Sequence, residues 1–220
     1  LPDTRFSQVY DRALMNKKTN YFFKNINDSN NIIFGSYDSK DEKIIYNTLL
    51  EMYPEGEKSL TNNNHRIILV PHEINLKLIN NLIERLKRNN FSIQLYSTLK
   101  NKVINDSIII VDCVGILADL YKYASLAYIG GGFTRGVHSV LEPGVHGCAI
   151  VYGPNIEMLD ELKEINKLDL GTMVYNDKDL LRVLKTSLEK IKKQGKELKD
   201  FISNKRNAAN KILTIIEKNI

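Results

Sequence analysis

The residues best suited to chemistry lie in one block, YIGGGFTRGVHSVLEPGVHG, which runs from Tyr128 to Gly147. Three glycines from Gly130 to Gly132 follow an apolar run, and backbone without Cβ atoms lets a ligand approach closely. The next segment, from Val137 to Glu142, predicts the first turn of a helix, whose free N–H groups favour a phosphate. Glu142 could then accept hydrogen bonds from vicinal hydroxyls such as those of a ribose. A structural glycine turn with a capping or ion-paired glutamate is the alternative.

Two further loops carry polar or glycine-containing sequences directly after apolar runs. In Val70-Pro71-His72-Glu73, the proline fixes φ and shapes the loop, while His72 can offer a donor or a cation to a phosphate. In the loop from Asp112 to Leu117, main-chain groups around Gly115 could read the edge of a base. Taken singly, each loop is equally compatible with a structural role.

A metal site is one competing interpretation of the glycine block. His138, Glu142 and His146 are spaced by four residues, so an uninterrupted helix would place them on one face. However, Pro143 and Gly144 fall between the second and third, and they predict a break in that helix. We therefore assign no metal and no metal cofactor to this chain.

Several familiar chemistries are not supported by the motifs. The first strand ends in Gly35-Ser36 rather than in GxGxxG, and neither GxxxxGK[ST] nor GxSxG occurs. Ser139 and His138 are adjacent, and adjacent residues point apart on a helix. No residue of this chain is therefore predicted to be catalytic.

Short apolar runs alternate with helical patterns along the chain, which predicts an α/β fold with a parallel sheet and helices on both faces. In such a sheet, ligands bind in the loops at the carboxyl ends of the strands. The expected strands are 32–34, 67–70, 93–96, 108–111, 126–129, 149–152 and 172–175.

Helical spacing predicts the elements between these strands. A first helix carries Phe6, Val9 and Tyr10 behind Asp3 and Thr4 as caps. Residues 55–64, rich in Asn and Glu, are interpreted as a flexible surface loop. The remaining helices are expected near 44–52, 78–86, 117–124 and 158–165, followed by two Lys-rich helices.

Composition places the 220-residue chain among ordinary globular proteins, with 43% hydrophobic and 26% charged residues. The net charge of +5 arises from residues 178–220, a basic helical tail whose twelve Lys/Arg and five Asp/Glu give +7, since the rest of the chain sums to −2. This charge indicates a solvated helix face, or one near anionic lipid, rather than nucleic-acid binding, since no aromatic residues interleave the lysines. Cys113 and Cys148 lie far apart, which favours reduced thiols over a disulfide.

In their order along the chain, these loops resemble the C-terminal domain of the 3-deoxy-D-manno-octulosonic acid (Kdo) transferases. The resemblance covers most of the 220 residues, and its most specific part is the glycine block with HxxLE and GPN. The matching motifs are Pro2-Asp3-Thr4-Arg5-Phe6, Gly35-Ser36 with Asp41-Glu42, Pro71-His72-Glu73, Val111-Asp112 with Gly115, Tyr121, and the block from Tyr128 to Pro154.

The resemblance implies the C-terminal, Rossmann-like half of a GT-B glycosyltransferase, which binds CMP-Kdo and transfers Kdo to a lipid A precursor in lipopolysaccharide biosynthesis of Gram-negative bacteria. Arg5, Gly131 and Gly132 are further candidates for donor contact. The implied CMP contacts are Pro71, His72, Val114, Gly115, Ile116, Ser139, Val140, Leu141 and Glu142. His72 stands where many members have Arg, and Ser139 where Asn is usual.

We read 1–220 as one nucleotide-sugar-binding domain and Leu1 as a cut through a longer protein. The family's general base and membrane anchor would belong to an N-terminal acceptor domain absent from this chain, so the chain alone is expected to be inactive. The implied location is the cytoplasmic face of the inner membrane. The alternatives are a related GT-B protein that uses a UDP-sugar, as a transferase or epimerase, and a non-catalytic nucleotide-binding module.

Overall fold

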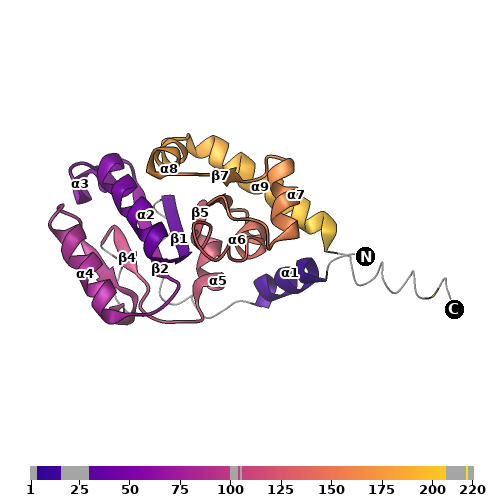
Figure 1. Cartoon of the computed structure of the whole chain (residues 1–220), viewed down its shortest axis with the longest axis horizontal. Coiled ribbons are helices and arrows are strands. Elements are labelled where there is room, and N and C mark those ends of the chain that lie inside the picture. Colours follow the sequence, from indigo (N-terminus) through magenta and orange to yellow (C-terminus); the bar gives the residue numbers. More distant parts are fainter. Residues whose placement is uncertain (1–3, 16–29, 100–103, 105, 207–216, 218–220) are drawn as a thin grey trace.

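The computed structural model describes residues 4–15, 30–99, 104, 106–206 and 217. Its sheet is entirely parallel, with the strand order β3-β4-β2-β1-β5-β6-β7 (Figure 1). All expected strands are present, so the predicted fold class is confirmed. They are β1 (Asn30–Tyr37), β2 (His65–Pro71), β3 (Ile93–Leu95), β4 (Ile108–Ile110), β5 (Leu126–Ile129), β6 (Ala149–Tyr152) and β7 (Thr172–Met173).

Helices cover both faces of the sheet, because successive strand residues contribute to opposite cores. Ile33 belongs to one buried cluster and Phe34 to the other. The first cluster lies under α1 (Arg5–Met15), α5 (Leu117–Leu120), α6 (Leu141–His146), α7 (Asp160–Lys167) and α9 (Leu188–Lys205). The second lies under α2 (Ser39–Met52), α3 (Glu57–Asn62), α4 (Leu76–Lys87) and α8 (Asp177–Leu184).

The direction of the chain connections reverses between β1 and β5. From β1 the chain passes through α2 towards β2 on one side, whereas β5 pairs with β1 on the other side and leads through α6 to β6. The loops after β1 and β5 therefore leave in opposite directions and open a crevice at the carboxyl ends of these strands. A ligand site is expected in this crevice.

The predicted flexible loop at 55–64 is wrong, because this segment contains α3. Leu60 is fully buried, and the Glu57 carboxylate accepts hydrogen bonds from the Ser92 N–H, at 3.2 Å, and from the Ser107 hydroxyl. One apolar residue among polar neighbours gives little periodic signal, yet its burial fixes this turn of helix against the sheet.

The helix after the glycine block also differs from the prediction. It begins at Leu141 rather than at Val137, and it continues through Pro143 and Gly144 to His146. A proline in the first helical turn has no intrahelical acceptor for an N–H, so its missing donor costs nothing there. The predicted break between Glu142 and His146 is therefore wrong, although His138 lies outside the helix.

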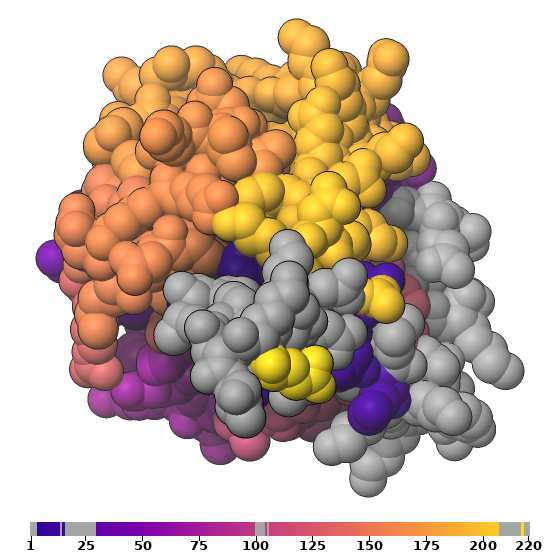
Figure 2. Space-filling model, turned by 90° about the vertical axis from the view of Figure 1, so that its right-hand side faces the viewer, coloured from indigo at the N-terminus to yellow at the C-terminus, as the bar shows by residue number. Residues whose placement is uncertain are grey.

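The Lys-rich helices form part of the packed fold over the described residues. Leu181 and Leu184 of α8 are buried, and α9 is held further along by Leu198 and Ile202. Figure 2 shows these C-terminal helices, in orange and yellow, over the upper part of one face of the molecule. The predicted cap Asp3, the motif residue Pro2, and tail residues 207–216 and 218–220 lie outside the described residues.

Close backbone contact fixes α9 against α6. A Cβ atom added to Gly195 would lie 2.0 Å from the carbonyl oxygen of Gly147, and one added to Gly144 would lie 2.5 Å from Ile202 Cδ1. Neither position has room for a side chain. None of the helices in the described part of the chain has the length and apolar composition that crossing a membrane requires.

We expect Gly195→Ala to destabilise the protein although alanine is the better helix former. Intrinsic propensity favours alanine by about 1 kcal/mol, but relieving the overlap with Gly147 must move α9, and such overpacking costs about 1–3 kcal/mol. Urea unfolding should therefore show a lower free energy of unfolding. Lys196→Ala, at an exposed neighbouring position, should change it by less than about 0.5 kcal/mol. A Gly195→Ala variant as stable as the wild type would refute this packing.

Candidate functional site

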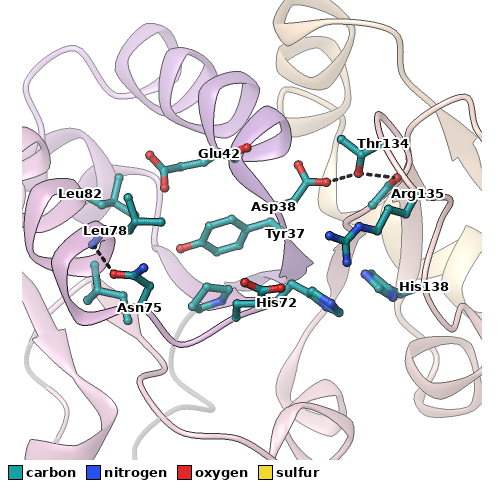
Figure 3. A pocket seen from close by; sticks show the side chains of 15 residues that line it. Tyr37, Asp38, Glu42, His72, Asn75, Leu78, Leu82, Thr134, Arg135 and His138 are labelled. Carbon is teal, nitrogen blue, oxygen red and sulfur yellow. Dashed lines mark hydrogen bonds between the residues drawn. The ribbon is translucent and has the colours of Figure 1, made fainter.

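A cavity of about 410 Å³ opens at the carboxyl ends of β1, β2 and β5. We call it the edge cavity. One wall is apolar and comes from Tyr37, Pro71 and the α4 residues Leu78, Ile79 and Leu82. The opposite wall carries His72, Arg135 and His138, whose side chains gather on the same side in Figure 3. The cavity therefore suits a molecule with both a weakly polar surface and an anionic group.

The Asp41 carboxylate holds the loops around this cavity together. It is fully buried and accepts hydrogen bonds from the Tyr128 hydroxyl at 2.6 Å and the Gly131 N–H at 2.8 Å. It also accepts one from the Asp38 N–H at 3.0 Å. Burial raises the pKa of Asp41, although these hydrogen bonds oppose the shift. The start of α2 is thus fixed to β5 and the glycine block.

Asp38 caps α2 and also reaches the glycine block. Its side chain accepts hydrogen bonds from the N–H groups of Lys40 and Asp41 in a capping box, and from the Thr134 hydroxyl. Burial acts to raise the pKa of Asp38, but these hydrogen bonds outweigh it and lower the pKa. An ionised Asp38 therefore orients the loop that carries Arg135.

The glycines of the block are required by packing between loops. A Cβ atom on Gly130 would lie 2.3 Å from the Ser36 carbonyl oxygen, and one on Gly132 would lie 2.6 Å from Gly153 Cα. Gly131 lines the edge cavity with φ +88°, but its N–H is engaged by Asp41. Close approach of neighbouring strand ends, rather than of a ligand, thus explains Gly130 and Gly132.

Two histidines meet where the loops after β2 and β5 converge. The rings of His72 and His138 are stacked, with centroids 4.5 Å apart and planes inclined by 19°. Burial lowers the pKa of His138, and so does His72, while Asp41 and Asp38 act in the opposite direction. His138 is therefore mainly neutral at pH 7, whereas Arg135 keeps its charge. Among the described residues, Arg135 has no ion-pair partner.

The residues predicted to hold CMP lie partly in the edge cavity and partly beside it. Pro71 and His72 line it, whereas the loop of Val114, Gly115 and Ile116 follows β4, the strand next to β2, and leads into α5. Gly115 has φ +85° and open space around it, so its main chain is accessible.

The predicted segment from Ser139 to Glu142 leads into α6. Ser139 is exposed, but the side chains of Val140 and Leu141 are buried, so only their main-chain groups can face a ligand. Within the described residues, no side chain caps the start of this helix. Its first N–H groups are consistent with the predicted anion contact.

Glu142 is partly buried at the start of α6. Its carboxylate lies 3.3 Å from Arg12 Nη1 in α1. Burial raises the pKa of Glu142, Arg12 lowers it and Asp119 raises it further. Arg5, the other predicted contact in α1, pairs instead with Glu161 of α7 at 2.9 Å. No cluster of metal-ligating side chains occurs among the described residues.

The two parts of the site meet at the stacked histidines. The predicted CMP residues other than Pro71 and His72 lie towards α5 and α6, whereas the edge cavity lies towards α2 and α4. Sequence reasoning singled out neither Thr134 nor Arg135, and it named Asp41 only within a motif. Arg135 lies inside the glycine block, so its position was the signal that could have identified it.

Sequence comparison supports the resemblance that the motifs indicate, although no family model matches the chain. The chain is 32% identical over 168 residues to a 3-deoxy-D-manno-octulosonic acid transferase of Aquifex aeolicus, covering 75% of this chain and 43% of that protein. It is 29% identical over 207 residues to a bifunctional glycosyltransferase/methyltransferase of Fusobacterium nucleatum, covering 92% and 30%. The chain thus spans less than half the length of these curated relatives.

Structural comparison gives the same fold. The C-terminal CMP-Kdo binding domain of WaaA from Acinetobacter baumannii matches with a TM-score of 0.62 at 14% identity, covering 89% of this chain and 98% of that one. The C-terminal domain of a group 1 glycosyl transferase, LpcC, from Francisella tularensis matches with a TM-score of 0.54 at 11% identity, covering 92% and 93%. This chain therefore has the fold of a C-terminal GT-B domain and is related in sequence to the Kdo transferases.

Proposed function

We propose that this chain is the CMP-Kdo-binding half of a Kdo transferase that acts in lipopolysaccharide biosynthesis. The observation that carries the proposal is the convergence of three predicted donor elements at one sheet edge: the loop with Pro71 and His72, the open loop at Gly115, and the uncapped start of α6. The sequence similarity to Kdo transferases over most of the chain supports the identity of the donor.

In this proposal, each element holds one part of CMP. Main-chain groups from Val114 to Ile116 read the cytosine, and Glu142 accepts hydrogen bonds from the ribose hydroxyls. The phosphate lies between the start of α6 and His72, where N–H groups and a histidine offer donors. This arrangement needs no metal on the protein.

Transfer of Kdo requires groups beyond these. The bond between the anomeric carbon and the CMP phosphate oxygen breaks as a lipid A precursor hydroxyl attacks with inversion, and a general base takes the hydroxyl proton. We propose that a facing N-terminal domain supplies the base, the bound acceptor and the membrane anchor. The whole enzyme would then act at the cytoplasmic face of the inner membrane.

Calorimetry with CMP, UMP and UDP tests the nucleotide assignment. We expect CMP to bind more tightly than UMP or UDP, because the proposed donor carries cytosine and one phosphate. A preference for UDP would favour a UDP-sugar enzyme instead. In a parallel assay with a lipid A precursor, we expect this chain to bind CMP without transferring Kdo, while the full-length enzyme does both. Turnover by this chain would contradict the proposed two-domain mechanism.

Glu142→Ala should weaken CMP binding while leaving the fold intact. A hydrogen bond to a charged group contributes about 1.5–3 kcal/mol, which corresponds to a loss of about tenfold to 150-fold in affinity. Arg12→Ala is the matched control, since it removes the ion pair with Glu142 but leaves the carboxylate. Unchanged CMP affinity in Glu142→Ala would show that the ribose is held elsewhere.

The histidine pair should make phosphodiester binding depend on pH. Because burial lowers the pKa of His138 in the free protein, an anion that favours its protonated form should bind more tightly as the pH falls below about 6.5. Cytidine 5′-methyl phosphate is the suitable probe, since its single negative charge stays constant over this range. We expect a severalfold gain between about pH 7.5 and 5.5.

Two variants assign this dependence to the pair. His138→Gln should remove most of it, and His72→Arg should flatten it by placing a permanent cation beside the phosphate. A flat profile for the wild-type protein would mean that the histidines contribute shape or neutral donors only.

A further inference from the structure

Apart from Pro71 and His72, the residues that line the edge cavity take no part in the proposed CMP contacts. The nucleotide would occupy the side of α5 and α6, while the cavity lies on the side of α2 and α4. His72 and His138 stand at the boundary and are stacked at 4.5 Å. A phosphate held there therefore directs the group attached to it, the sugar, into the cavity. Its volume of about 410 Å³ is within the range of small-molecule sites.

One wall of the cavity carries a permanent positive charge, the guanidinium of Arg135. Arg135 lines it and has no ion-pair partner among the described residues. In Figure 3 its side chain lies near His138, between Asp38 and His72. Two of the three acids in the lining are engaged, since Asp38 accepts from Thr134 and two main-chain N–H groups and Glu42 pairs with Arg85 at 2.8 Å. The third acid, Glu73, is left to accept hydrogen bonds from a ligand.

The rest of the lining suits a polyhydroxylated ring. Asn75 and Glu73 offer hydrogen-bonding groups, and the face made by Tyr37, Leu78 and Leu82 can pack against the weakly polar side of a sugar. A neutral sugar would use these groups but would leave the Arg135 guanidinium without a partner. A carboxylated sugar would satisfy both, because a guanidinium binds a carboxylate through two parallel hydrogen bonds.

We propose that the edge cavity is the subsite for the sugar of the donor, and that Arg135 binds its carboxylate and selects an acidic sugar. The proposal rests on the proposed function, since it takes the nucleotide to be held beside the cavity. Arg135 thereby positions the anomeric carbon at the boundary marked by the stacked histidines. Its role is specificity and positioning, because it contacts the carboxylate rather than the breaking bond.

The test compares three ligands by calorimetry at low temperature: CMP, CMP-Kdo, and CMP-Kdo whose carboxylate is methyl-esterified. We expect the wild-type protein to bind the acid about tenfold more tightly than the ester, as for a charge-assisted hydrogen bond. Arg135→Gln should lower the affinity for the acid to that for the ester, with CMP affinity unchanged. Arg135→Lys should retain part of the preference.

Arg88→Gln makes the same chemical change at an exposed position six residues beyond Leu82, and it should preserve the preference. Equal affinity of the wild-type protein for acid and ester would overturn the proposal, and so would an Arg135→Gln variant that still prefers the acid. Absent CMP binding would instead overturn the proposed function. The two failures are therefore distinguishable.

Discussion

The architecture of this domain around its site depends on one buried carboxylate. Asp41 has no exposed surface, yet it accepts three hydrogen bonds, from the Tyr128 hydroxyl and the N–H groups of Gly131 and Asp38. A buried charge without such partners costs several kcal/mol, so the three donors must stay in place for Asp41 to remain ionised. They come from opposite sides of the topological reversal between β1 and β5. One side chain thus fixes the two loops that form the crevice.

Sequence patterning predicted the sheet well, because a strand buried on both faces must be apolar at every position. Runs such as 108–111 and 126–129 therefore stand out from their surroundings. Segments that depend on a single contact were missed. The helix α3 is anchored by Leu60, and α6 passes through Pro143 because its first turn needs no N–H there. Neither the burial of Leu60 nor the position of Pro143 within the first helical turn can be read from local composition.

The candidate site was likewise predicted only in part from the sequence. The location of the candidate site was predicted from the rule that ligands bind at the carboxyl ends of parallel strands. The glycine block, which directly follows β5, indicated that the site lies at the end of this strand. The partners within it could not be predicted from spacing. Asp38 and Asp41 reach Thr134 and Gly131 across ninety or more positions of sequence, and the stacking of His72 on His138 joins two separate loops. Such contacts arise only when β1, β2 and β5 are placed side by side.

The Lys-rich helices connect the remote end of the chain to this site. The position of α6 is set on one side by the glycine block and on the other by α9, whose Gly195 touches the Gly147 backbone while Ile202 lies over Gly144. Because α6 begins with Leu141 and Glu142, any shift of α9 also moves the N–H groups and carboxylate assigned to the donor. The glycines of this contact therefore maintain the geometry of the proposed nucleotide site, and the lysines on the outer face of α9 are free of that constraint. The inner face of α9 must fit α6 closely, whereas its outer face tolerates charge, and this difference explains how so basic a helix forms part of a packed α/β domain.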